Sequence, residues 1–160
     1  MSVAFTKEDS AETAAETILP DRPVSAAANL VTAAGLAALE SEFEQARIAH
    51  DAASTIEDVN ERRRQAAAPL RDLRYFAERL RTAQLVAPPD TTDIVSFGHA
   101  VTYRRADGKL ATYRIVGEDE ADPRAGSMSY LAPVAQRLVG KAVGDMVEFG
   151  DSELEIITIA

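Results

Sequence analysis

The sequence predicts an α+β protein, in which an antiparallel coiled-coil hairpin precedes a small antiparallel sheet domain. Beyond residue 88, apolar and polar residues alternate with the period of strands. Before it, apolar side chains recur at the 3-4 spacing of a coiled-coil seam in two segments: Leu36, Leu39, Phe43, Ala46 and His50, then Leu70, Leu73, Ala77 and Leu80. Two such stripes can pack together as a hairpin.

Three segments follow one another along the chain. Residues 1–29 are rich in Ala, Ser, Thr and Glu without a sustained apolar period, which predicts a flexible tail. Residues 30–87 form the hairpin, and Thr32 is a suitable N-cap for its first helix. Pro69 either opens the second helix or kinks a longer one. The run "VAPPDTTD" ends the helical pattern, so residues 88–160 form the sheet domain.

The clearest local signal in the sheet domain is a β-hairpin. The runs "AVTYRR" and "LATYRIVG" flank Asp107-Gly108, which supplies the positive φ that a tight turn needs. The remaining elements predicted for this domain are a strand at "SMSY", a short helix at "PVAQRLVG", and strands at "MVEF" and "ELEIITIA" on either side of Gly150-Asp151.

Composition excludes several classes of protein. A net charge of −9 argues against wrapping duplex nucleic acid, because phosphate neutralisation needs a basic face. The absence of cysteine excludes disulfides, thiolate nucleophiles and cysteine-ligated zinc. No apolar run approaches the length of a membrane span, and the N-terminus lacks the pattern of a signal peptide. We therefore expect a cytoplasmic protein that does not contact membranes.

The stretch between the two helical stripes holds the strongest candidate for chemistry. Asp58 and Glu61 are three residues apart, which places both carboxylates on one side of a helical turn, where they could share a magnesium ion or an activated water. The alternative is a solvated acidic tip. His50 is expected to pack in the seam and His99 to lie at the surface.

Arginines follow directly after this acidic pair. Arg62, Arg63, Arg64 and Arg71 could neutralise RNA phosphate near the tip, with Arg74 as a further candidate. Pairing with acidic residues of the hairpin is the ordinary alternative. Neither a glycine-rich phosphate loop nor a nucleophile elbow is present in the sequence, so intrinsic nucleotide binding and triad chemistry are not expected.

Two motifs in the second half resemble the C-terminal domain of the Gre factors, GreA and GreB. They are "YRIVGEDEADP", residues 113–123, and "APVAQRLVGKAVGD", residues 132–145, in which Ala132 stands where the family usually has serine. The resemblance implies an FKBP-like domain that docks on the rim of the secondary channel of bacterial RNA polymerase, while the coiled coil points inward. It also implies a transcription elongation factor that modulates elongation or the cleavage of backtracked transcripts, and that is not an enzyme but at most stimulates the RNA cleavage activity of the polymerase. Because a hairpin that folds back on itself needs no second copy, we expect a monomer.

The same resemblance assigns roles to individual residues. Asp58 and Glu61 look like the family's Asp-x-x-Glu pair, which would share the magnesium ion of the polymerase near the nascent RNA 3′ end. No intrinsic cofactor is then needed. The residues expected to bind the polymerase are Asp119, Glu120, Asp122, Pro123 and Pro133.

Three alternatives stay open at the level of sequence. The helical stripes are roughly one heptad shorter than in typical cleavage factors, and the residues around the acidic pair differ, which leaves room for an Rnk-like regulator that binds polymerase without cleavage. A prolyl isomerase is suggested by the FKBP-like fold alone. A module that dimerises through its coiled coil follows from the periodicity alone.

Overall fold

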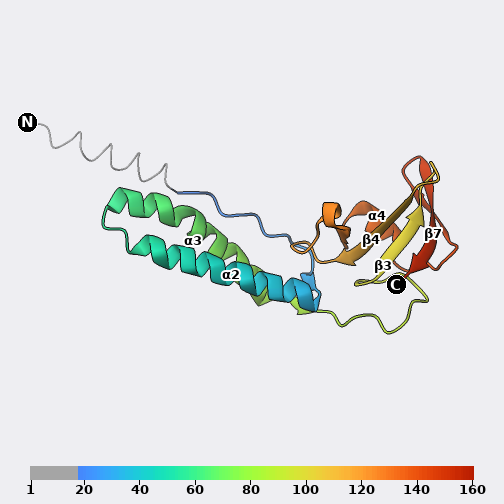
Figure 1. The fold of residues 1–160 in the computed structure, drawn as a ribbon, viewed down its shortest axis with the longest axis horizontal. Coiled ribbons are helices and arrows are strands. Elements are labelled where there is room, and N and C mark those ends of the chain that lie inside the picture. The colour runs from blue at the N-terminus through green and yellow to red at the C-terminus, as the bar shows by residue number, and fades with distance from the viewer. Residues whose placement is uncertain (1–17) are drawn as a thin grey trace, which may run out of the picture. The chain divides into compact units, whose positions relative to one another are not determined.

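The computed structural model describes residues 18–160, and this part of the chain divides into two compact units (Figure 1). One unit contains residues 18–27 and Leu39–Thr82, and the other contains Ala28–Ala38 and Ala83–Ala160. The expected hairpin, residues 30–87, therefore contributes both of its ends to the second unit.

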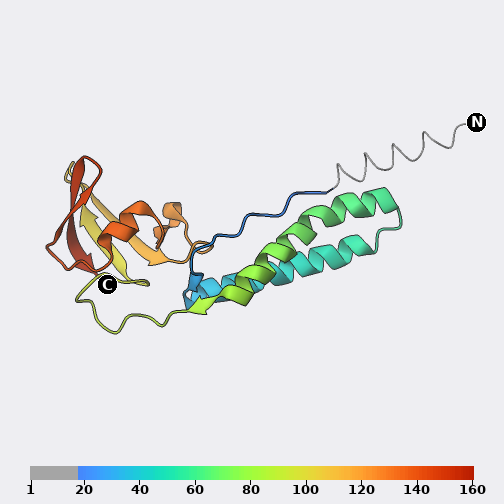
Figure 2. The same ribbon diagram turned by 180° about the vertical axis from the view of Figure 1, so that it is seen from behind.

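The order of elements agrees with the predicted α+β class. The two long helices precede the strands of the five-stranded sheet, as both ribbon views show (Figures 1 and 2). In chain order the elements are β1 (Leu30–Val31), α2 (Ala33–Ser54), α3 (Val59–Thr82), β2 (Gln84–Leu85), β3 (Ala100–Arg104), β4 (Leu110–Val116), the 3₁₀ turn η1 (Pro123–Ala125), β5 (Ser127–Ser129), α4 (Pro133–Leu138), β6 (Met146–Phe149) and β7 (Ser152–Ile159).

Helix α2 begins where its predicted cap lies. The Thr32 hydroxyl accepts a hydrogen bond from the Gly35 amide, with an N–O distance of 3.0 Å. The Thr32 carbonyl accepts the first helical hydrogen bond from the Leu36 amide. These two bonds satisfy amides that the first turn of a helix would otherwise leave unpaired, so Thr32 is the N-cap.

The seam of the hairpin follows the predicted pattern on α2 and departs from it on α3. Leu39 and Ala53 of α2 are buried, in step with the 3-4 spacing. On α3, Phe76 and Arg79 are buried, whereas Ala77, which was expected in the seam, is exposed. The larger Phe76 ring removes more apolar surface from water than the methyl group of Ala77, which favours the observed rotation of the helix.

Pro69 lies inside α3, ten residues after its start. Of the two sequence-based alternatives, a longer helix that contains the proline is therefore the one observed. Proline has no amide hydrogen and cannot donate to the carbonyl four residues earlier, so one hydrogen bond of the helix is missing at this point.

The segment before β1 is only partly covered by the structure, because residues 1–17 of the predicted flexible tail lie outside the described residues. Residues 18–27, however, run beside α3 (Figures 1 and 2). The Arg22 guanidinium lies 3.8 Å from the centre of the Tyr75 ring. The flexibility of the tail stays a prediction, but in this structure the segment contacts α3 through a cation–π interaction that no periodicity reveals.

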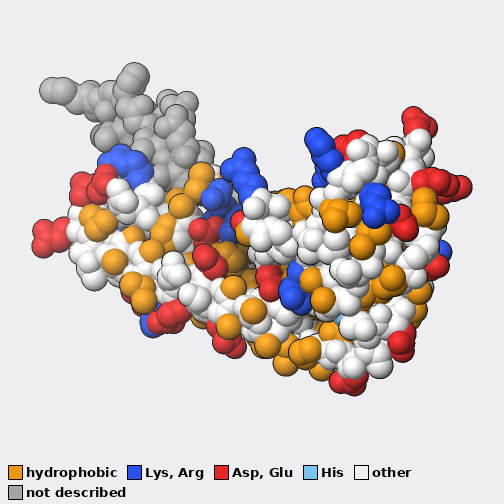
Figure 3. Space-filling model, turned by 45° about the vertical axis from the view of Figure 1, so that its right-hand side comes forward, with side chains coloured by type: hydrophobic (Ala, Val, Ile, Leu, Met, Phe, Trp, Pro, Cys, Tyr) orange, Lys and Arg blue, Asp and Glu red, His pale blue; other side chains and the backbone are white. Residues whose placement is uncertain are grey.

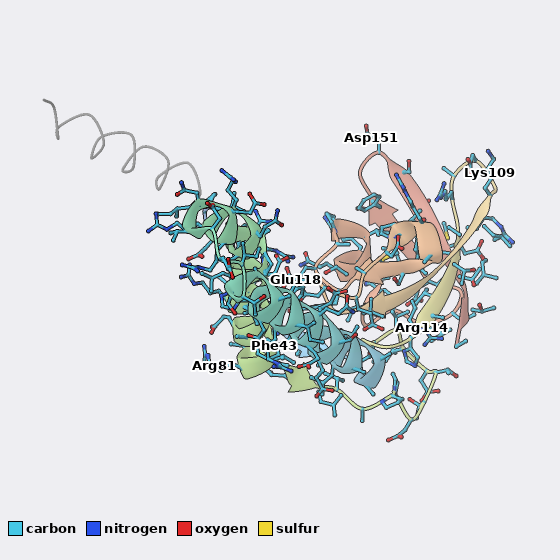
Figure 4. All side chains as sticks on the ribbon, turned by 60° about the vertical axis from the view of Figure 1, so that its left-hand side comes forward. Phe43, Arg81, Lys109, Arg114, Glu118 and Asp151 are labelled. Carbon is cyan, nitrogen blue, oxygen red and sulfur yellow. The ribbon has the colours of Figure 1, made fainter. Side chains whose placement is uncertain are left out.

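The second unit is built on a five-stranded sheet in the order β5-β4-β3-β7-β6. Strands β3 and β4 form the predicted hairpin, and Gly108 has a φ of 80° in the turn. Strands β6 and β7 form a second hairpin across Gly150-Asp151. Figure 4 labels one residue at each turn, Lys109 and Asp151.

One strand of this sheet differs from the expected antiparallel arrangement. Strand β5 pairs with β4 in parallel, through Arg114 and Ser127 at one end and Val116 and Ser129 at the other. The connection between them, residues 117–126, carries the η1 turn and returns the chain so that β5 runs in the same direction. A second, two-stranded sheet pairs β1 with β2 in parallel.

The core of the second unit lies between the sheet and α4. Its fully buried side chains include Ile115, Leu138 and Ile156. His99 belongs to the same interior, with only 3% of its surface exposed, so its predicted surface position is wrong. Its Nδ1 atom accepts from the Ser96 amide, and its Nε2 atom lies 2.8 Å from the Thr91 carbonyl oxygen.

The surface of the protein mixes charges of both signs. Figure 3 shows acidic and basic side chains interspersed with apolar atoms over the visible face. Within residues 18–160, no helix combines the length and the apolar character that crossing a lipid bilayer requires.

Candidate functional site

The turn that joins α2 to α3 carries the predicted acidic pair, and Asp58 is the residue directly before α3. Its Oδ1 atom accepts a hydrogen bond from the Glu61 amide, with an N–O distance of 2.7 Å. Its carbonyl accepts from the Arg62 amide. Asp58 is therefore the N-cap of α3, and the spacing Asp-x-x-Glu has a structural use as half of a capping box.

The second carboxylate of the pair turns toward the helix. One oxygen of Glu61 accepts from the Arg64 guanidinium at 2.6 Å, and the other accepts from the Gln65 amide group at 2.8 Å. The hydrogen bond from Arg64 holds the pKa of Glu61 below its ordinary value, with Gln65 acting in the same direction. Glu61 is consequently an ionised carboxylate whose two oxygens both have partners.

The four arginines proposed to contact RNA have different surroundings. Arg62 donates to the Ile56 carbonyl at 3.0 Å and closes the turn, and Arg64 pairs with Glu61. Arg71 is half-buried, and its Nε atom has no hydrogen-bond partner among the described residues. Arg63 is exposed. Arg63 and Arg71 are thus the members of the set that the turn itself does not use.

The pair fits a magnesium ion only in part. Its donors are carboxylate oxygens, which Mg²⁺ prefers, and the ion commonly takes one or two carboxylates from protein. The Oδ2 atom of Asp58 takes no part in the cap, whereas Glu61 would have to leave Arg64 and Gln65 to bind a metal. Residues 18–160 contain no group of three or more acidic, histidine or cysteine side chains that could hold an ion by themselves. An ion at this turn would need further ligands from another molecule.

The acidic loop after β4 holds the residues expected to bind the polymerase, and part of it is used inside the second unit. The Glu120 carboxylate accepts from the Thr32 hydroxyl at an O–O distance of 2.6 Å. Because Thr32 is the N-cap of α2, Glu120 supports the start of that helix. Asp119 is exposed on the same loop.

The other three residues of the expected polymerase-binding set begin short helical turns. Asp122 caps η1 by accepting from the Arg124 amide at 3.0 Å, and Pro123 is the first residue of that turn. Pro133 is the first residue of α4. Both prolines are exposed and occupy positions where the missing amide hydrogen costs nothing.

Two glycines that sequence reasoning missed hold this loop in place. A Cβ atom on Gly117 would lie 2.3 Å from the Leu30 carbonyl oxygen, and one on Gly35 would lie 2.6 Å from a Glu120 carboxylate oxygen. The approach at Gly117 requires glycine because the opposing atom belongs to the backbone, whereas at Gly35 the Glu120 side chain could move aside. The position of Gly117 directly before three acidic residues was the available signal in the sequence, but it does not reveal that Leu30 is the residue that comes close to it.

Comparison with known proteins identifies a family. The model of the family described as "Transcription elongation factor, GreA/GreB, C-term" matches residues 89–160. A transcription elongation factor GreA of Sphingopyxis alaskensis is 36% identical over 125 residues, which cover 72% of this chain and 77% of the relative. A GreA of Methylobacterium nodulans is 34% identical over 150 residues, covering 81% and 95%. The match to a GreB of Neisseria meningitidis, 36% identical over 95 residues, covers 58% of that relative.

The solved structures to which the chain is similar are more distant in sequence. A GreA/GreB factor from Nitrosomonas europaea is 22% identical, covers 82% of this chain and 98% of its own, and superposes with a TM-score of 0.40. For GreA factor homolog 1 of Thermus thermophilus the values are 18%, 84% and 99%, with a TM-score of 0.38. The sequence relatives carry the assignment, and this chain belongs to the GreA/GreB family.

Proposed function

We propose that the protein is a Gre-type transcription elongation factor that binds bacterial RNA polymerase in the cytoplasm, and that it is not itself an enzyme. The observation that carries the proposal is the likeness to a GreA over 77% of that relative's length, which extends from the sheet domain into the hairpin. In this reading the sheet domain anchors the protein at the rim of the secondary channel, and the hairpin enters the channel.

The turn between α2 and α3 is the part of the hairpin that would approach the catalytic centre of the polymerase. Asp58 would offer its Oδ2 atom to the magnesium ion held there, and Glu61 would follow after leaving Arg64. Such an ion polarises a phosphoryl oxygen and lowers the pKa of a bound water. Arg63 and Arg71 would neutralise phosphates of the nascent RNA.

A second candidate function is supported by the contacts of the same pair. Asp58 already caps α3, and both oxygens of Glu61 already have donors. Reorganising Glu61 costs free energy, since the Arg64 and Gln65 donors left behind must find new partners, whereas Asp58 can keep its cap. A regulator that occupies the channel without stimulating cleavage, as in Rnk-like proteins, needs no such reorganisation.

Binding is tested first, by gel filtration of the full chain with bacterial core RNA polymerase. Co-elution is expected for the wild type and for the double charge reversal of Glu44 and Glu78, which lie on the hairpin away from its turn. Reversal of Asp119 is expected to weaken binding mainly through the association rate, as for charges at the rim of an interface. A chain that never co-elutes would refute the proposal.

Cleavage is tested with backtracked elongation complexes that carry labelled RNA. Asp58→Asn keeps a side chain that can cap the helix but removes the negative charge. Glu61→Gln likewise removes the negative charge and keeps the size of the side chain. Glu78→Gln is the matched control, because Glu78 pairs with Arg81 three residues later at 2.6 Å, as Glu61 does with Arg64. Cleavage that disappears in both tip variants but not in the control supports the first candidate. Binding without cleavage by any variant supports the second.

A further inference from the structure

Arg22 makes the most extensive contacts between segment 18–27 and α3. The Arg22 guanidinium stacks on Tyr75 at 3.8 Å and lies 5.1 Å from the centre of the Phe76 ring. One of its nitrogens donates to the Asp72 carboxylate at 3.1 Å. The two rings meet edge to face, so the cation lies against an aromatic pair and beside a carboxylate.

A second ion pair lies beside the first, and in it the segment supplies the carboxylate and the helix supplies the arginine. Asp21 accepts from the Arg74 guanidinium at 3.3 Å, next to the pair formed by Arg22 and Asp72. An Asp-Arg dipeptide of the segment thus faces an Asp and an Arg of the helix, and each cation meets a carboxylate. This arrangement selects for the order of the two charges, because reversing the dipeptide would oppose like charges.

Apolar residues continue the surface beyond the ion pairs. A hollow of about 490 Å³ is lined by Ile18 and Leu19 on one side, and by Ala66, Ala67 and Leu70 of α3 with arginines around them on the other. Leu19 stands three residues before Arg22. The surface therefore matches a segment with an apolar residue, any residue, an aspartate and an arginine in that order, as in Leu19-Pro20-Asp21-Arg22.

Little else retains the segment. Ile18 is 76% exposed, and Val24 is also exposed. Within the described part of the chain, residues 18–26 form no main-chain hydrogen bond with the main chain of α3. The ion pairs are partly or largely exposed and are individually weak. A segment held by partly exposed side-chain contacts of this kind can detach without unfolding the helix beneath it.

We propose that the α3 face formed by Asp72, Arg74 and Tyr75 is a docking surface for an extended protein segment of the type Leu-x-Asp-Arg on a partner, and that segment 18–27 occupies it in the free protein. The present occupant indicates the chemistry of the partner, because its Asp21 and Arg22 pair with Arg74 and Asp72 and its Arg22 lies over the Tyr75 ring. Nucleic acid fits less well, since its phosphates would meet the Asp72 carboxylate. The inference goes beyond the polymerase-binding role, although Arg63 and Arg71, which that role assigns to RNA, also line the hollow beside this face.

Tethering determines how the surface would be controlled. The segment belongs to the same chain, so its effective concentration at α3 is high and a partner must compete with it. Loss of the Arg22 anchor therefore exposes the surface, while loss of Tyr75 or Asp72 removes it. These two kinds of substitution have opposite effects on binding of a peptide added from outside.

The test uses a fluorescent peptide with the sequence of residues 18–27 and the full-length chain. The double variant Asp21→Ala, Arg22→Ala is expected to bind the peptide at least roughly tenfold more tightly than the wild type, whose surface is occupied. Adding Asp72→Asn or Tyr75→Leu to the double variant is expected to abolish that gain. Arg104→Ala, which breaks an exposed ion pair with Glu155 in the sheet domain, is the matched control and should bind like the wild type.

Clear outcomes would overturn the proposal. Equal peptide affinity for the double variant and the wild type would mean that the segment does not mask a surface. If adding Asp72→Asn to the double variant leaves the peptide affinity unchanged, the peptide binds elsewhere. Circular dichroism shows whether Tyr75→Leu unfolds the helix, and in that case the Asp72→Asn result alone is used. Displacement of the peptide by an equal concentration of single-stranded RNA would show that the face binds phosphate and not a protein segment.

Discussion

The hairpin and the sheet domain are stabilised in different ways. The sheet domain has a continuous core, whose buried members are Val95, Val101, Tyr103, Ile115, Met128, Ala135, Leu138, Val147, Leu154, Ile156 and Ile159. Between residues 39 and 82 the buried side chains are Leu39, Ala53, Phe76 and Arg79, and one of these carries a charge. The hairpin therefore depends far less on burial of apolar surface.

Surface ion pairs are correspondingly frequent on the hairpin. Pairs three residues apart join Glu44 with Arg47, Glu61 with Arg64, and Glu78 with Arg81. Figure 4 shows Arg81 reaching away from the helical pair, as expected for a solvent-exposed partner. The unit proposed to anchor the protein is therefore the one with the larger apolar core. The unit proposed to enter a channel depends on weak contacts that salt and pH can change.

The largest effect is expected in the core of the sheet domain. Ile156→Ala removes a fully buried side chain, which should lower the free energy of unfolding by about 2–5 kcal/mol. Urea unfolding followed by circular dichroism measures the change. Ile48→Ala on α2, where the side chain is 57% exposed, is the control and should change stability by less than about 0.5 kcal/mol. Similar losses in both variants would contradict the contrast between the units.

A smaller loss is expected from the buried histidine. His99→Ala removes the acceptor of the Ser96 amide and the partner of the Thr91 carbonyl, and each group left unpaired costs about 1–3 kcal/mol. Hydrogen exchange of the Ser96 amide should accelerate with the loss of stability. The half-buried His50 is the control, since His50→Ala should leave that exchange unchanged.

The cap of α3 comes next in magnitude. Asp58→Ala should cost about 1 kcal/mol because the Glu61 amide loses its acceptor, whereas Asp58→Asn should cost less because asparagine also caps helices. Urea unfolding compares the two variants. Equal destabilisation by both would show that charge at the turn, and not the cap, stabilises the helix.

The smallest effect concerns pH and salt. Hydrogen bonds from arginine hold three glutamate pKa values below their ordinary value, so each pair stabilises the hairpin above about pH 4.5 and loses that contribution as the pH falls through the lowered value. Helicity at 222 nm should therefore fall on acidification below about pH 4.5, and less so in about 1 M salt. The residues concerned are Glu44, Glu61 and Glu78. A fall unaffected by substituting all three with glutamine would contradict this account.

The sequence predicted those elements whose signals are local. Alternation of apolar and polar residues around Asp107-Gly108 is sufficient to predict the β3–β4 hairpin. Thr32, a residue type that commonly caps helices, is sufficient to predict the start of α2. Strands β1 and β2 were missed because two residues each are too few to show a period. The burial of His99 and the docking of Arg22 depend on residues far away in the chain, so no local pattern reveals them.

For the candidate site, the sequence predicted where the residues lie better than it predicted their hydrogen bonds. The position of Asp58 and Glu61 between the two apolar stripes was sufficient to place both where α2 ends and α3 begins. Their hydrogen bonds depend on α3 starting at Val59, well before Pro69, and that start could not be chosen from the sequence. The role of Glu120 at the start of α2 likewise needed the fold of the second unit.

The measurement that tests the central claim most directly is proximity mapping of the hairpin turn on the polymerase. The chain has no cysteine, so a photo-crosslinker can be placed on Asn60→Cys at the turn and, for comparison, on Ser41→Cys in the first half of α2. Both positions are exposed. The account predicts that the turn crosslinks to polymerase peptides that hold the catalytic magnesium, while position 41 crosslinks nearer the channel entrance. Crosslinks from the turn only to the outer surface of the polymerase, in a complex that co-elutes, would contradict it.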